Sequence, residues 1–190
     1  MQNILLLGAG RSATSLINYL KKHAPEENWH IRIGDFDIKL AEDKAGNHPN
    51  TSAIQFDILN EIQTKDEIAK ADLVISMLPA RFHPKVATVC VDQGKHMVTA
   101  SYNSTDVDEL SDIAKSKNII ILMECGLDPG IDHMTAMEAM DKIREKGGKL
   151  TSFKSYTGGL VAPESDNNPW HYKFTWNPRN VVLAGQGTAQ

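Results

Sequence analysis

The sequence predicts an α/β fold, a doubly wound parallel sheet covered by helices and followed by the start of a second α+β domain. Short apolar runs alternate along the chain with segments whose apolar residues recur at the helical period. The first apolar run, ILLL at 4–7, also ends in two glycines one residue apart, as at a tight strand-to-helix turn. Because parallel neighbours need a crossover and a helix is a compact one, this alternation indicates a parallel sheet.

Six strands and five helices follow from this pattern, in chain order. The apolar runs predict strands at 4–7, 30–34, 53–56, 73–77, 96–99 and 119–123. The segments between them predict helices at 12–22, 38–45, 62–71, 84–93 and 107–117. In the first helix, Leu16, Ile17 and Leu20 form one apolar stripe. Each strand is therefore joined to the next by a helix, as a doubly wound sheet requires.

Length and composition bound the domain organisation. A chain of 190 residues and 21.0 kDa can bury one sizeable core and begin a second. We expect a dinucleotide-binding domain over residues 1–125 and the start of a second domain over 126–190. Cys90 and Cys125 lie in no metal-binding spacing, so the sequence predicts buried thiols and no metal site.

The charge and the apolar runs exclude two classes of partner. The formal charge is −4 and no basic run is present, so we expect no nucleic-acid partner. The apolar runs are far shorter than the ~20 residues that cross a membrane, and no basic region precedes the first of them. We expect a soluble cytoplasmic protein that acts on a small molecule.

The glycine turn matches a dinucleotide-binding motif. Residues 8–13 read G-x-G-x-x-A, which lets a pyrophosphate approach the backbone at the amino end of the first helix. A simple tight turn is the alternative reading of the glycines. In this Rossmann-type arrangement, the predicted contacts are Gly8, Gly10, Arg11, Ser12 and Ala13.

An acidic residue follows the second strand. Asp35 comes 27 residues after Gly8, where the motif expects a carboxylate for the ribose hydroxyls of the adenosine. A carboxylate repels a 2′-phosphate, so the predicted coenzyme is NAD, with NADP as the alternative. Asp37 is an alternative to Asp35 if the strand runs longer.

Two further strand ends lie on the expected path of a dinucleotide. Asp57 follows the third strand beside the expected adenine site, with a helix cap or a plain turn as its alternative role. Met77, Leu78 and Pro79 end the fourth strand and predict an apolar shelf near the nicotinamide ribose, although they can also form a simple turn before the next helix.

Three longer segments carry a family resemblance. These are VTASYNS at 98–104, MECGLDPGIDHM at 123–134 and GGKLTSFKSYTGGLVAPESDNNPWHYKFTW at 147–176. Together with the glycine turn they closely resemble the glutamate-forming saccharopine dehydrogenases over nearly the whole chain. Lysine 6-dehydrogenases and carboxynorspermidine dehydrogenases share the glycine turn but match the later segments less well, and their substrates are the alternatives.

The resemblance implies a reaction and a set of contacts. The reaction is NAD(P)-dependent conversion of saccharopine to glutamate and 2-aminoadipate 6-semialdehyde. The resemblance places nicotinamide and substrate against two loops, and the residues that it implicates are Ser101, Tyr102, Leu127, Asp128 and Pro129. Ser101, Leu127 and Pro129 are thus expected to contact the dinucleotide, and Ser101, Tyr102 and Asp128 the substrate.

The residues themselves agree with this placement. Both loops follow strands at the carboxyl edge of the sheet, where open α/β sheets bind ligands. Asp128 can hold an ammonium group, and Tyr102, Asp128 and His133 are the candidate proton carriers, with no general base assigned. Two plainer roles stay open: Asp128 and Pro129 also read as the start of a helix, and His133 as a structural histidine.

The C-terminal part gives weaker signals. Residues 157–170 predict a substrate or hinge loop or an irregular crossover. Trp170, Tyr172, Phe174 and Trp176 alternate with polar residues, as in a half-buried strand. The last residues read as a helix cut in its first turns, so we expect a truncated chain, for which nucleotide binding without turnover is the alternative function. A homodimer is expected only by analogy with proteins of this fold.

Overall fold

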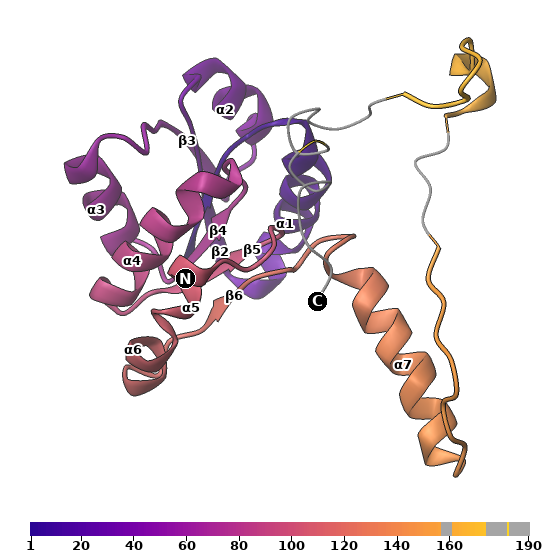
Figure 1. The fold of residues 1–190 in the computed structure, drawn as a ribbon. Coiled ribbons are helices and arrows are strands. Elements are labelled where there is room, and N and C mark those ends of the chain that lie inside the picture. Colours follow the sequence, from indigo (N-terminus) through magenta and orange to yellow (C-terminus); the bar gives the residue numbers. More distant parts are fainter. Residues whose placement is uncertain (157–160, 174–181, 183–190) are drawn as a thin grey trace. The chain divides into compact units, whose positions relative to one another are not determined.

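The computed structural model describes residues 1–156, 161–173 and 182, and it divides the chain into two compact units, Met1–Lys142 and Ile143–Gln190. The first unit contains a six-stranded sheet with helices on both faces (Figure 1). Every pair of neighbouring strands is parallel, and the strand order is β3-β2-β1-β4-β5-β6. The predicted fold class is therefore confirmed.

The strands are those that the sequence predicts, with small differences at their ends. They are β1 (Gln2–Leu7), β2 (Trp29–Asp35), β3 (Thr51–Gln55), β4 (Leu73–Ser76), β5 (His96–Thr99) and β6 (Ile121–Leu122). The α-helices are α1 (Thr14–Glu27), α2 (Ile38–Ala45), α3 (Glu61–Ala69), α4 (His83–Gln93), α5 (Thr105–Asp108), α6 (Ser111–Ser116) and α7 (Ile131–Glu145). Three 3₁₀ turns accompany them: η1 (Arg11–Ala13), η2 (Ala80–Phe82) and η3 (Pro163–Ser165).

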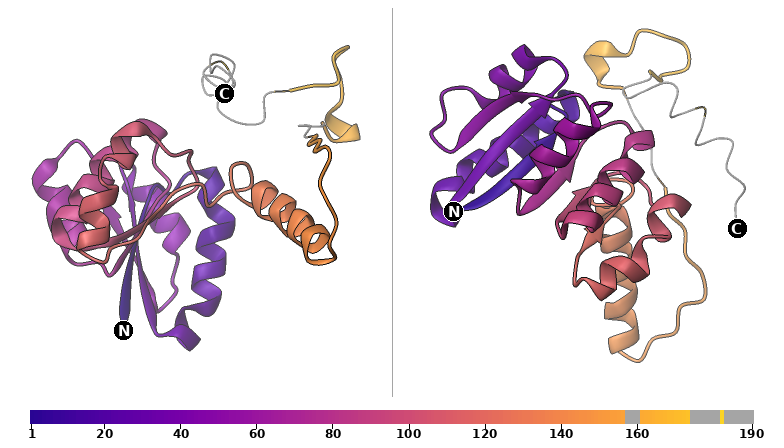
Figure 2. Two further views of the ribbon diagram at one scale, coloured as in Figure 1. Left: turned by 60° about the horizontal axis from the view of Figure 1, so that its bottom comes forward. Right: turned by 90° about the vertical axis from the view of Figure 1, so that its left-hand side faces the viewer.

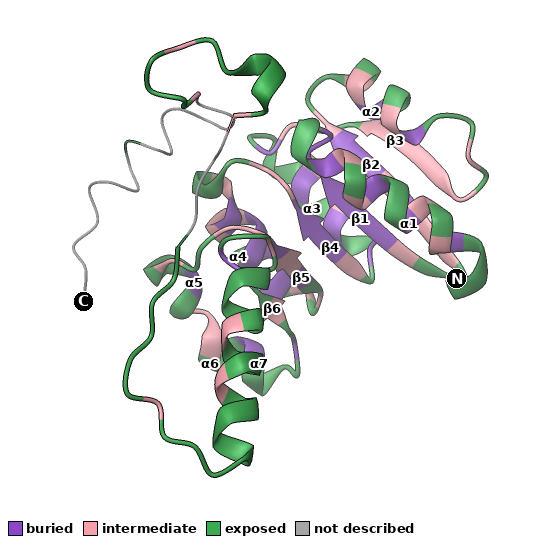
Figure 3. Cartoon of the chain, turned by 90° about the vertical axis from the view of Figure 1, so that its right-hand side faces the viewer, coloured by how far each residue is buried: buried purple, intermediate pink, exposed green. Residues whose placement is uncertain are grey.

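Strand β1 explains why the sheet is covered on both faces. All its residues from Ile4 to Leu7 are apolar and buried, and successive side chains point to opposite faces. Ile4 and Leu6 belong to the core beneath α1 and α2, whereas Leu5 and Leu7 belong to the core beneath α3 and α4. The two turned views show the sheet between these helical layers (Figure 2), and the buried residues concentrate in its strands (Figure 3).

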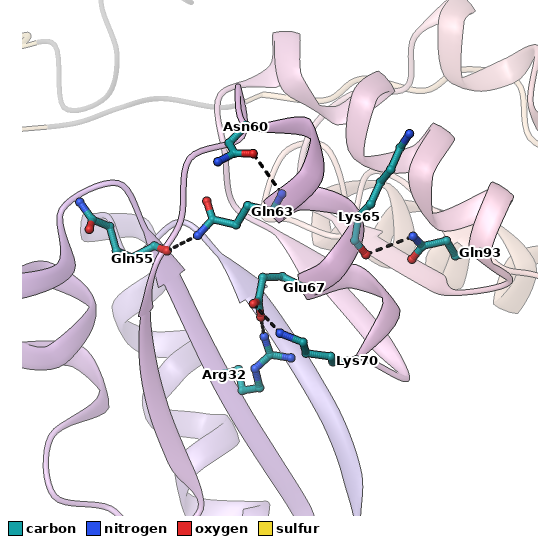
Figure 4. Close-up of polar contacts among 8 residues, drawn as sticks. All are labelled: Arg32, Gln55, Asn60, Gln63, Lys65, Glu67, Lys70 and Gln93. Atoms are coloured by element: carbon teal, nitrogen blue, oxygen red, sulfur yellow. Dashed lines mark hydrogen bonds and ion pairs between the residues drawn. The ribbon is translucent and has the colours of Figure 1, made fainter.

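Helix α3 is fixed to its neighbours by polar contacts (Figure 4). The guanidinium of Arg32 on β2 pairs with the carboxylate of Glu67, which also pairs with Lys70 at 2.8 Å. The amide of Gln63 donates to the backbone oxygen of Gln55 at the end of β3 at 2.7 Å. Both side chains of the Arg32–Glu67 pair are mostly buried, and burial lowers the pKa of Arg32. The pair therefore joins the helix to the sheet inside the protein.

The segment before the sixth strand differs from the prediction. The single helix expected at 107–117 is wrong, because the structure has two short helices, α5 and α6, instead. The strand expected at 119–123 is reduced to Ile121–Leu122. Asn118 adopts a left-handed backbone with φ of 55°, and the Ile119 N–H returns to the Ala114 carbonyl at 2.9 Å. This turn uses Ile119, the first residue of the apolar run, as a helix stop, so the strand begins later than expected.

The second unit is described only in part. In its described residues, Trp170 lies in a turn and is 80% exposed, so the half-buried strand expected from the alternating aromatics is wrong at this position. The Trp170 N–H donates to the side chain of Asn168 at 3.0 Å, which closes a local turn in place of an extended strand. Phe174 and Trp176 lie outside the described residues, as do parts of the predicted 157–170 loop and nearly all of the predicted C-terminal helix.

Two kinds of feature are absent from the described residues. None of the helices described is long and apolar enough to cross a membrane. Among the residues with described positions, no three histidine, cysteine or acidic side chains gather as they would around a metal ion.

Candidate functional site

The first glycine of the turn after β1 is required by the backbone. Gly8 has a φ of +101°, a conformation that residues with a side chain rarely adopt. A Cβ atom at this position would lie 2.8 Å from the backbone oxygen of Met77. The Gly8 N–H donates to the Gly34 carbonyl at 2.7 Å, so the turn is held between β2 and β4.

The second glycine is not required by the protein itself. Gly10 has an ordinary φ of −62°, and a Cβ atom built on it would meet no described protein atom within 4 Å. Gly10 nevertheless lines a cavity, and the helical segment η1–α1 begins immediately after it. The absent side chain therefore leaves open space at a helix amino end, which is where a pyrophosphate binds. This geometry fits a dinucleotide.

The cavity beside the turn has a volume of about 440 Å³ and lies at the carboxyl ends of β1 to β4. It brings together six of the predicted dinucleotide contacts: Gly8, Gly10, Asp35, Asp57, Leu78 and Pro79. Apolar side chains that the sequence analysis did not assign, including Phe36 and Leu59, complete the lining. Both are largely exposed, at 72% and 68%, so they offer free apolar surface to a planar base.

Asp35 is held in place by two backbone groups. One carboxylate oxygen accepts the Ala9 N–H at 2.7 Å, and the other accepts the Asp37 N–H at 3.0 Å. Asp37 instead caps α2 by accepting the Lys39 N–H at 3.0 Å, and it does not line the cavity. Of the two alternatives, Asp35 is therefore the carboxylate that faces a ligand in the cavity.

The Asp57 carboxylate stabilises the turn in which Asp57 itself lies. Its carboxylate accepts the Leu59 N–H at 2.9 Å, whereas Asn60 caps α3 by accepting the Gln63 N–H at 3.1 Å. The helix-cap alternative for Asp57 is therefore wrong and the turn alternative is confirmed. The residue also lines the cavity, so a ligand contact stays a prediction.

The other predicted residues of the glycine motif lie just outside the cavity. Arg11 and Ser12 are exposed in η1, and neither is part of the lining. Ala13 is fully buried in the core under α1, where its small side chain allows close packing of the helix. Ala13 therefore supports the motif by packing, and a direct contact with the ligand is not open to its side chain.

The loops after β5 and β6 meet at the same edge of the sheet. The phenol of Tyr102 donates to a carboxylate oxygen of Asp128 at 3.0 Å, across 26 residues of sequence. This hydrogen bond, together with burial and the negative charges of Asp128, Asp132 and Glu124, raises the pKa of Tyr102. The pair is exposed and keeps negative charge at this edge, which suits a substrate ammonium group.

The loop 126–130 is shaped by backbone contacts, and it corrects one prediction. Helix α7 begins at Ile131, so its cap position falls on Gly130 and Asp128 is not the cap of that helix. The peptide bond between Asp128 and Pro129 is cis. Gly130 has a φ of +148°, and a Cβ atom there would collide with the backbone of Gly126. This close approach turns the chain so that Asp128 faces Tyr102. Leu127 in the same loop is 75% exposed.

His133 lies in the first turn of α7, as expected. Its Nδ1 is 2.9 Å from the carboxylate of Asp132, which also accepts the Gly130 N–H at 3.0 Å. Both side chains are exposed. Within the described residues, His133 makes no hydrogen bond to Tyr102 or Asp128, so its role as a proton carrier stays a prediction.

The sequence analysis missed one buried residue at this edge. His83, at the start of α4, is 1% exposed, and its ring contacts Ser101 at the end of β5. Burial lowers the pKa of His83 to about 4. The sequence places this histidine seven residues after Ser76 with no recognisable spacing, so only the packing of α4 on the sheet reveals the contact.

Comparison with known proteins agrees with this architecture. Residues 4–122 match the family described as saccharopine dehydrogenase NADP binding domain, and residues 126–190 match the saccharopine dehydrogenase C-terminal domain. The predicted boundary after residue 125 itself stays a prediction.

Among individual proteins, the chain is 38% identical over its whole length to a saccharopine dehydrogenase [NADP(+), L-glutamate-forming] of Schizosaccharomyces pombe, and covers 42% of it. It is 36% identical to an alpha-aminoadipic semialdehyde synthase of Arabidopsis thaliana, with 98% of this chain and 19% of that protein aligned. A solved structure of apo saccharopine dehydrogenase (L-Glu forming) from Saccharomyces cerevisiae superposes with a TM-score of 0.86 at 36% identity, covering 97% of this chain and 40% of that one.

The chain therefore spans about two fifths of the length of these dehydrogenases and a smaller share of the synthase. The family matches and the shared fold extend from the glycine turn through the Tyr102–Asp128 loops. On these grounds, the chain belongs to the saccharopine dehydrogenase family.

Proposed function

We propose that this chain forms the dinucleotide-binding part of a glutamate-forming saccharopine dehydrogenase. The observation that carries the proposal is one sheet edge with two neighbouring features. A cavity lined by Gly10 and Asp35 suits a dinucleotide, and an exposed Tyr102–Asp128 pair follows the next strands. The names of the relatives support the same reaction, in an oxidoreductase of lysine metabolism.

The bound dinucleotide would accept a hydride from the carbon beside the secondary amine of saccharopine, and water would then release glutamate and 2-aminoadipate 6-semialdehyde. In this proposal, the glycine turn holds the pyrophosphate and Phe36 and Leu59 cover the adenine. Asp128 holds a substrate ammonium group until its proton is removed, because the secondary amine must be neutral when the hydride leaves. Tyr102 keeps the Asp128 carboxylate oriented through the hydrogen bond of 3.0 Å. His133 is a candidate proton carrier at the same edge.

We further propose that the preferred coenzyme is NAD. The family and several relatives carry NADP in their names, so binding of NADP is supported at the level of the family. In this chain, however, the Asp35 carboxylate lines the cavity and is fixed there by the N–H groups of Ala9 and Asp37. A fixed carboxylate accepts hydrogen bonds from the two ribose hydroxyls of NAD and repels the 2′-phosphate of NADP.

Calorimetric titration of the chain with NAD, NADP and then saccharopine tests these proposals. We expect both dinucleotides to bind, with NAD the tighter. Saccharopine added to the chain with its nucleotide bound should show weak binding at most if residues beyond this chain complete the substrate site. A folded chain that bound neither dinucleotide would overturn the proposed function. Tighter binding of NADP would overturn only the coenzyme preference.

A further inference from the structure

His83 forms a buried polar cluster with three hydroxyl side chains. Its Nε2 lies 2.7 Å from the hydroxyl oxygen of Ser101 and 3.2 Å from that of Thr99. Its Nδ1 lies 3.0 Å from the hydroxyl of Ser76 at the end of β4. His83, Ser76 and Thr99 are each at most 1% exposed, whereas Ser101 is half-buried at the sheet edge. The cluster thus leads from the core to one hydroxyl that a ligand can reach.

The position of Ser101 relates the cluster to the nicotinamide half of a dinucleotide. In a sheet of order 3-2-1-4-5-6, one mononucleotide lies over β1 to β3 and the other over β4 to β6. The cavity with Gly10 and Asp35 lies over the ends of β1 to β3 and extends to β4 through Leu78 and Pro79. Ser101 follows β5, farther into the second half of the sheet. The proposed function therefore brings Ser101 beside the nicotinamide end, and the inference below rests on it.

The contact does not make Ser101 a nucleophile. In hydrolytic serine–histidine pairs, a carboxylate at the second ring nitrogen stabilises the imidazolium that forms. Here the partner of Nδ1 is the neutral hydroxyl of Ser76, and the burial that lowers the pKa of His83 to about 4 disfavours its protonation. The ring therefore stays neutral at physiological pH, and it is a poor proton acceptor.

The hydrogen bonds of a neutral imidazole have a defined direction. One ring nitrogen donates a hydrogen bond and the other accepts one. If Nε2 accepts the Ser101 proton, the Ser101 oxygen is left to accept from a ligand. If Nε2 donates, the Ser101 proton is left to be donated outward. Because Nδ1 must take the opposite role toward Ser76, the cluster as a whole selects one of these two states.

We propose that His83 is a positioning residue that fixes the rotamer and the hydrogen-bonding direction of the Ser101 hydroxyl toward the nicotinamide half of the bound dinucleotide. Thr99 completes the arrangement, because its hydroxyl contacts Nε2 and also accepts the Ser101 N–H at 3.4 Å. The backbone and side chain of Ser101 are thereby held by the same pair of buried residues. His83 acts through Ser101 and does not touch the ligand itself.

Two substitutions of His83 separate this role from plain packing. The amide of glutamine reaches about as far as Nε2, and the amide of asparagine about as far as Nδ1. His83→Gln therefore keeps the contact with Ser101, whereas His83→Asn keeps the contact with Ser76 and loses Ser101. Affinities are measured for NAD or NADP, whichever binds more tightly, and for the matching ADP-ribose, which lacks the nicotinamide. Thermal melting checks the folding of each variant of the 190-residue chain.

We expect His83→Asn to weaken dinucleotide binding about fivefold, as for the loss of one neutral hydrogen bond, and to leave ADP-ribose binding unchanged. His83→Gln should stay within about twofold of the unchanged chain. In a Ser101→Ala background, His83→Asn should have no further effect, because the group through which it acts is gone.

Several outcomes would overturn the inference. The first is that His83→Asn weakens the binding of ADP-ribose and of the dinucleotide equally. The second is that His83→Asn has its full effect on dinucleotide affinity even when Ser101→Ala is present. The third is that His83→Gln loses as much dinucleotide affinity as His83→Asn. If His83→Asn does not fold, Ser76→Ala replaces it. Loss of the hydrogen bond at Nδ1 should weaken dinucleotide binding about twofold and leave ADP-ribose binding unchanged, and no change in dinucleotide binding would refute the proposal. If the unchanged, folded chain binds ADP-ribose and the dinucleotide equally, only this inference fails; if it binds neither, the proposed function fails and this inference with it.

Discussion

At the scale of single residues, the site depends on side chains whose direction is fixed by hydrogen bonds to neighbouring segments. Each oxygen of the Asp35 carboxylate accepts one backbone N–H, from Ala9 in the glycine turn and from Asp37 before α2. Each of these oxygens has a further lone pair for a ligand. Asp35 thus both braces the turn and places a negative charge in the cavity.

The first prediction concerns this charge. Asp35→Asn keeps an acceptor oxygen for one of the two backbone N–H groups and removes the negative charge. We therefore expect NADP affinity to rise relative to NAD by about tenfold or more. Adding Phe36→Arg should move the preference further toward NADP. Competitive titration with the two dinucleotides measures the ratio.

Asp37→Asn is the matched control, because Asp37 caps α2 and does not line the cavity. We expect it to leave the affinity ratio unchanged. An affinity ratio that did not respond to Asp35→Asn would show that this carboxylate does not face the 2′ position.

The second prediction concerns the buried histidine. The pKa of His83 is about 4 in the folded protein, below its ordinary value of 6.5, because burial disfavours the charged ring. Between these two values the unfolded chain binds a proton that the folded protein does not. The free energy of unfolding should therefore fall by about 3 kcal/mol as the pH is lowered from 6.5 to 4, with little further loss from this group below that range.

Urea unfolding at pH 7 and pH 4.5 measures this dependence. His83→Gln has no titrating ring, so its free energy of unfolding should fall less over the same interval. The other acidic and histidine side chains are common to both proteins and contribute equally. An identical loss in both proteins would contradict the assignment of a low pKa to His83.

At the scale of elements, a glycine in a turn at a strand end either allows a backbone conformation that other residues rarely adopt or leaves open space beside the turn. Gly8 and Gly10 stand two residues apart in one motif but differ in what surrounds them. A Cβ atom would collide with the Met77 backbone at the first position and meet nothing at the second. The motif therefore contains one glycine that the fold requires and one that the surrounding protein atoms do not require.

The third prediction separates these two glycines. Gly8→Ala should lower the free energy of unfolding by about 2–4 kcal/mol through the strained φ and the close Met77 oxygen. Gly10→Ala should change the free energy of unfolding by less than about 0.5 kcal/mol and yet weaken dinucleotide binding at least tenfold. Denaturant unfolding and calorimetry, applied to both variants, give the two quantities. A Gly10→Ala variant that binds the dinucleotide with full affinity would show that the pyrophosphate does not bind at this turn.

The attachment of α3 is a second feature at this scale. The carboxylate of Glu67 pairs with Arg32 on β2, in a position where both side chains are at most 15% exposed (Figure 4). An ion pair of this kind stabilises little compared with apolar residues, but removal of one member leaves a charge without its partner.

The fourth prediction follows from this asymmetry. Glu67→Leu should lower the free energy of unfolding by about 2 kcal/mol, and Arg32→Met added to it should recover most of the loss. Lys70→Met is the control, because Lys70 is 59% exposed and its contact with Glu67 should contribute at most about 0.5 kcal/mol. Urea unfolding of the four proteins tests this, and a double variant less stable than Glu67→Leu would contradict it.

At the scale of the whole molecule, the strand order determines where the candidate site forms. β1 pairs with β2 on one side and with β4 on the other, so the connections after β1 and β4 leave the sheet in opposite directions. This point is where open α/β sheets bind ligands. All predicted site residues with described positions, from Gly8 to His133, lie within the unit Met1–Lys142.

The fifth prediction tests this placement over the whole chain. Adding the dinucleotide at 100 times its dissociation constant should raise the free energy of unfolding by about 2.7 kcal/mol. In hydrogen exchange measured under the same conditions, the added protection should concentrate at the carboxyl ends of the strands, in peptides that contain residues 8–13, 35–37, 77–79 and 99–102. Protection at the opposite edge of the sheet would place the dinucleotide elsewhere.

Much of the fold could be predicted because its signals are local. The apolar run at Ile4–Leu7, the helical stripe of Leu16, Ile17 and Leu20, and the glycine motif all depend on neighbours in sequence. The prediction failed where a local signal had two outcomes. The apolar run after Asn118 was predicted as a full strand, but its first residue instead ends α6 by a hydrogen bond to Ala114.

For the site, the sequence identified chain positions and the tertiary structure decided which of them meet. Asp35 was recognisable from its distance to Gly8, since strand and helix lengths in this motif vary little. The hydrogen bond between Tyr102 and Asp128 spans 26 residues, and the contact of His83 with Ser101 spans 18. Such contacts depend on how strands register and how helices pack on them, and no periodicity in the chain encodes that. By itself the sequence determined the alternation of elements, the glycine turn and the family. Only the tertiary structure decided that Asp128 faces Tyr102 and caps no helix, that Gly10 borders open space, and that a buried histidine holds Ser101, because each of these depends on distances between segments far apart in the chain.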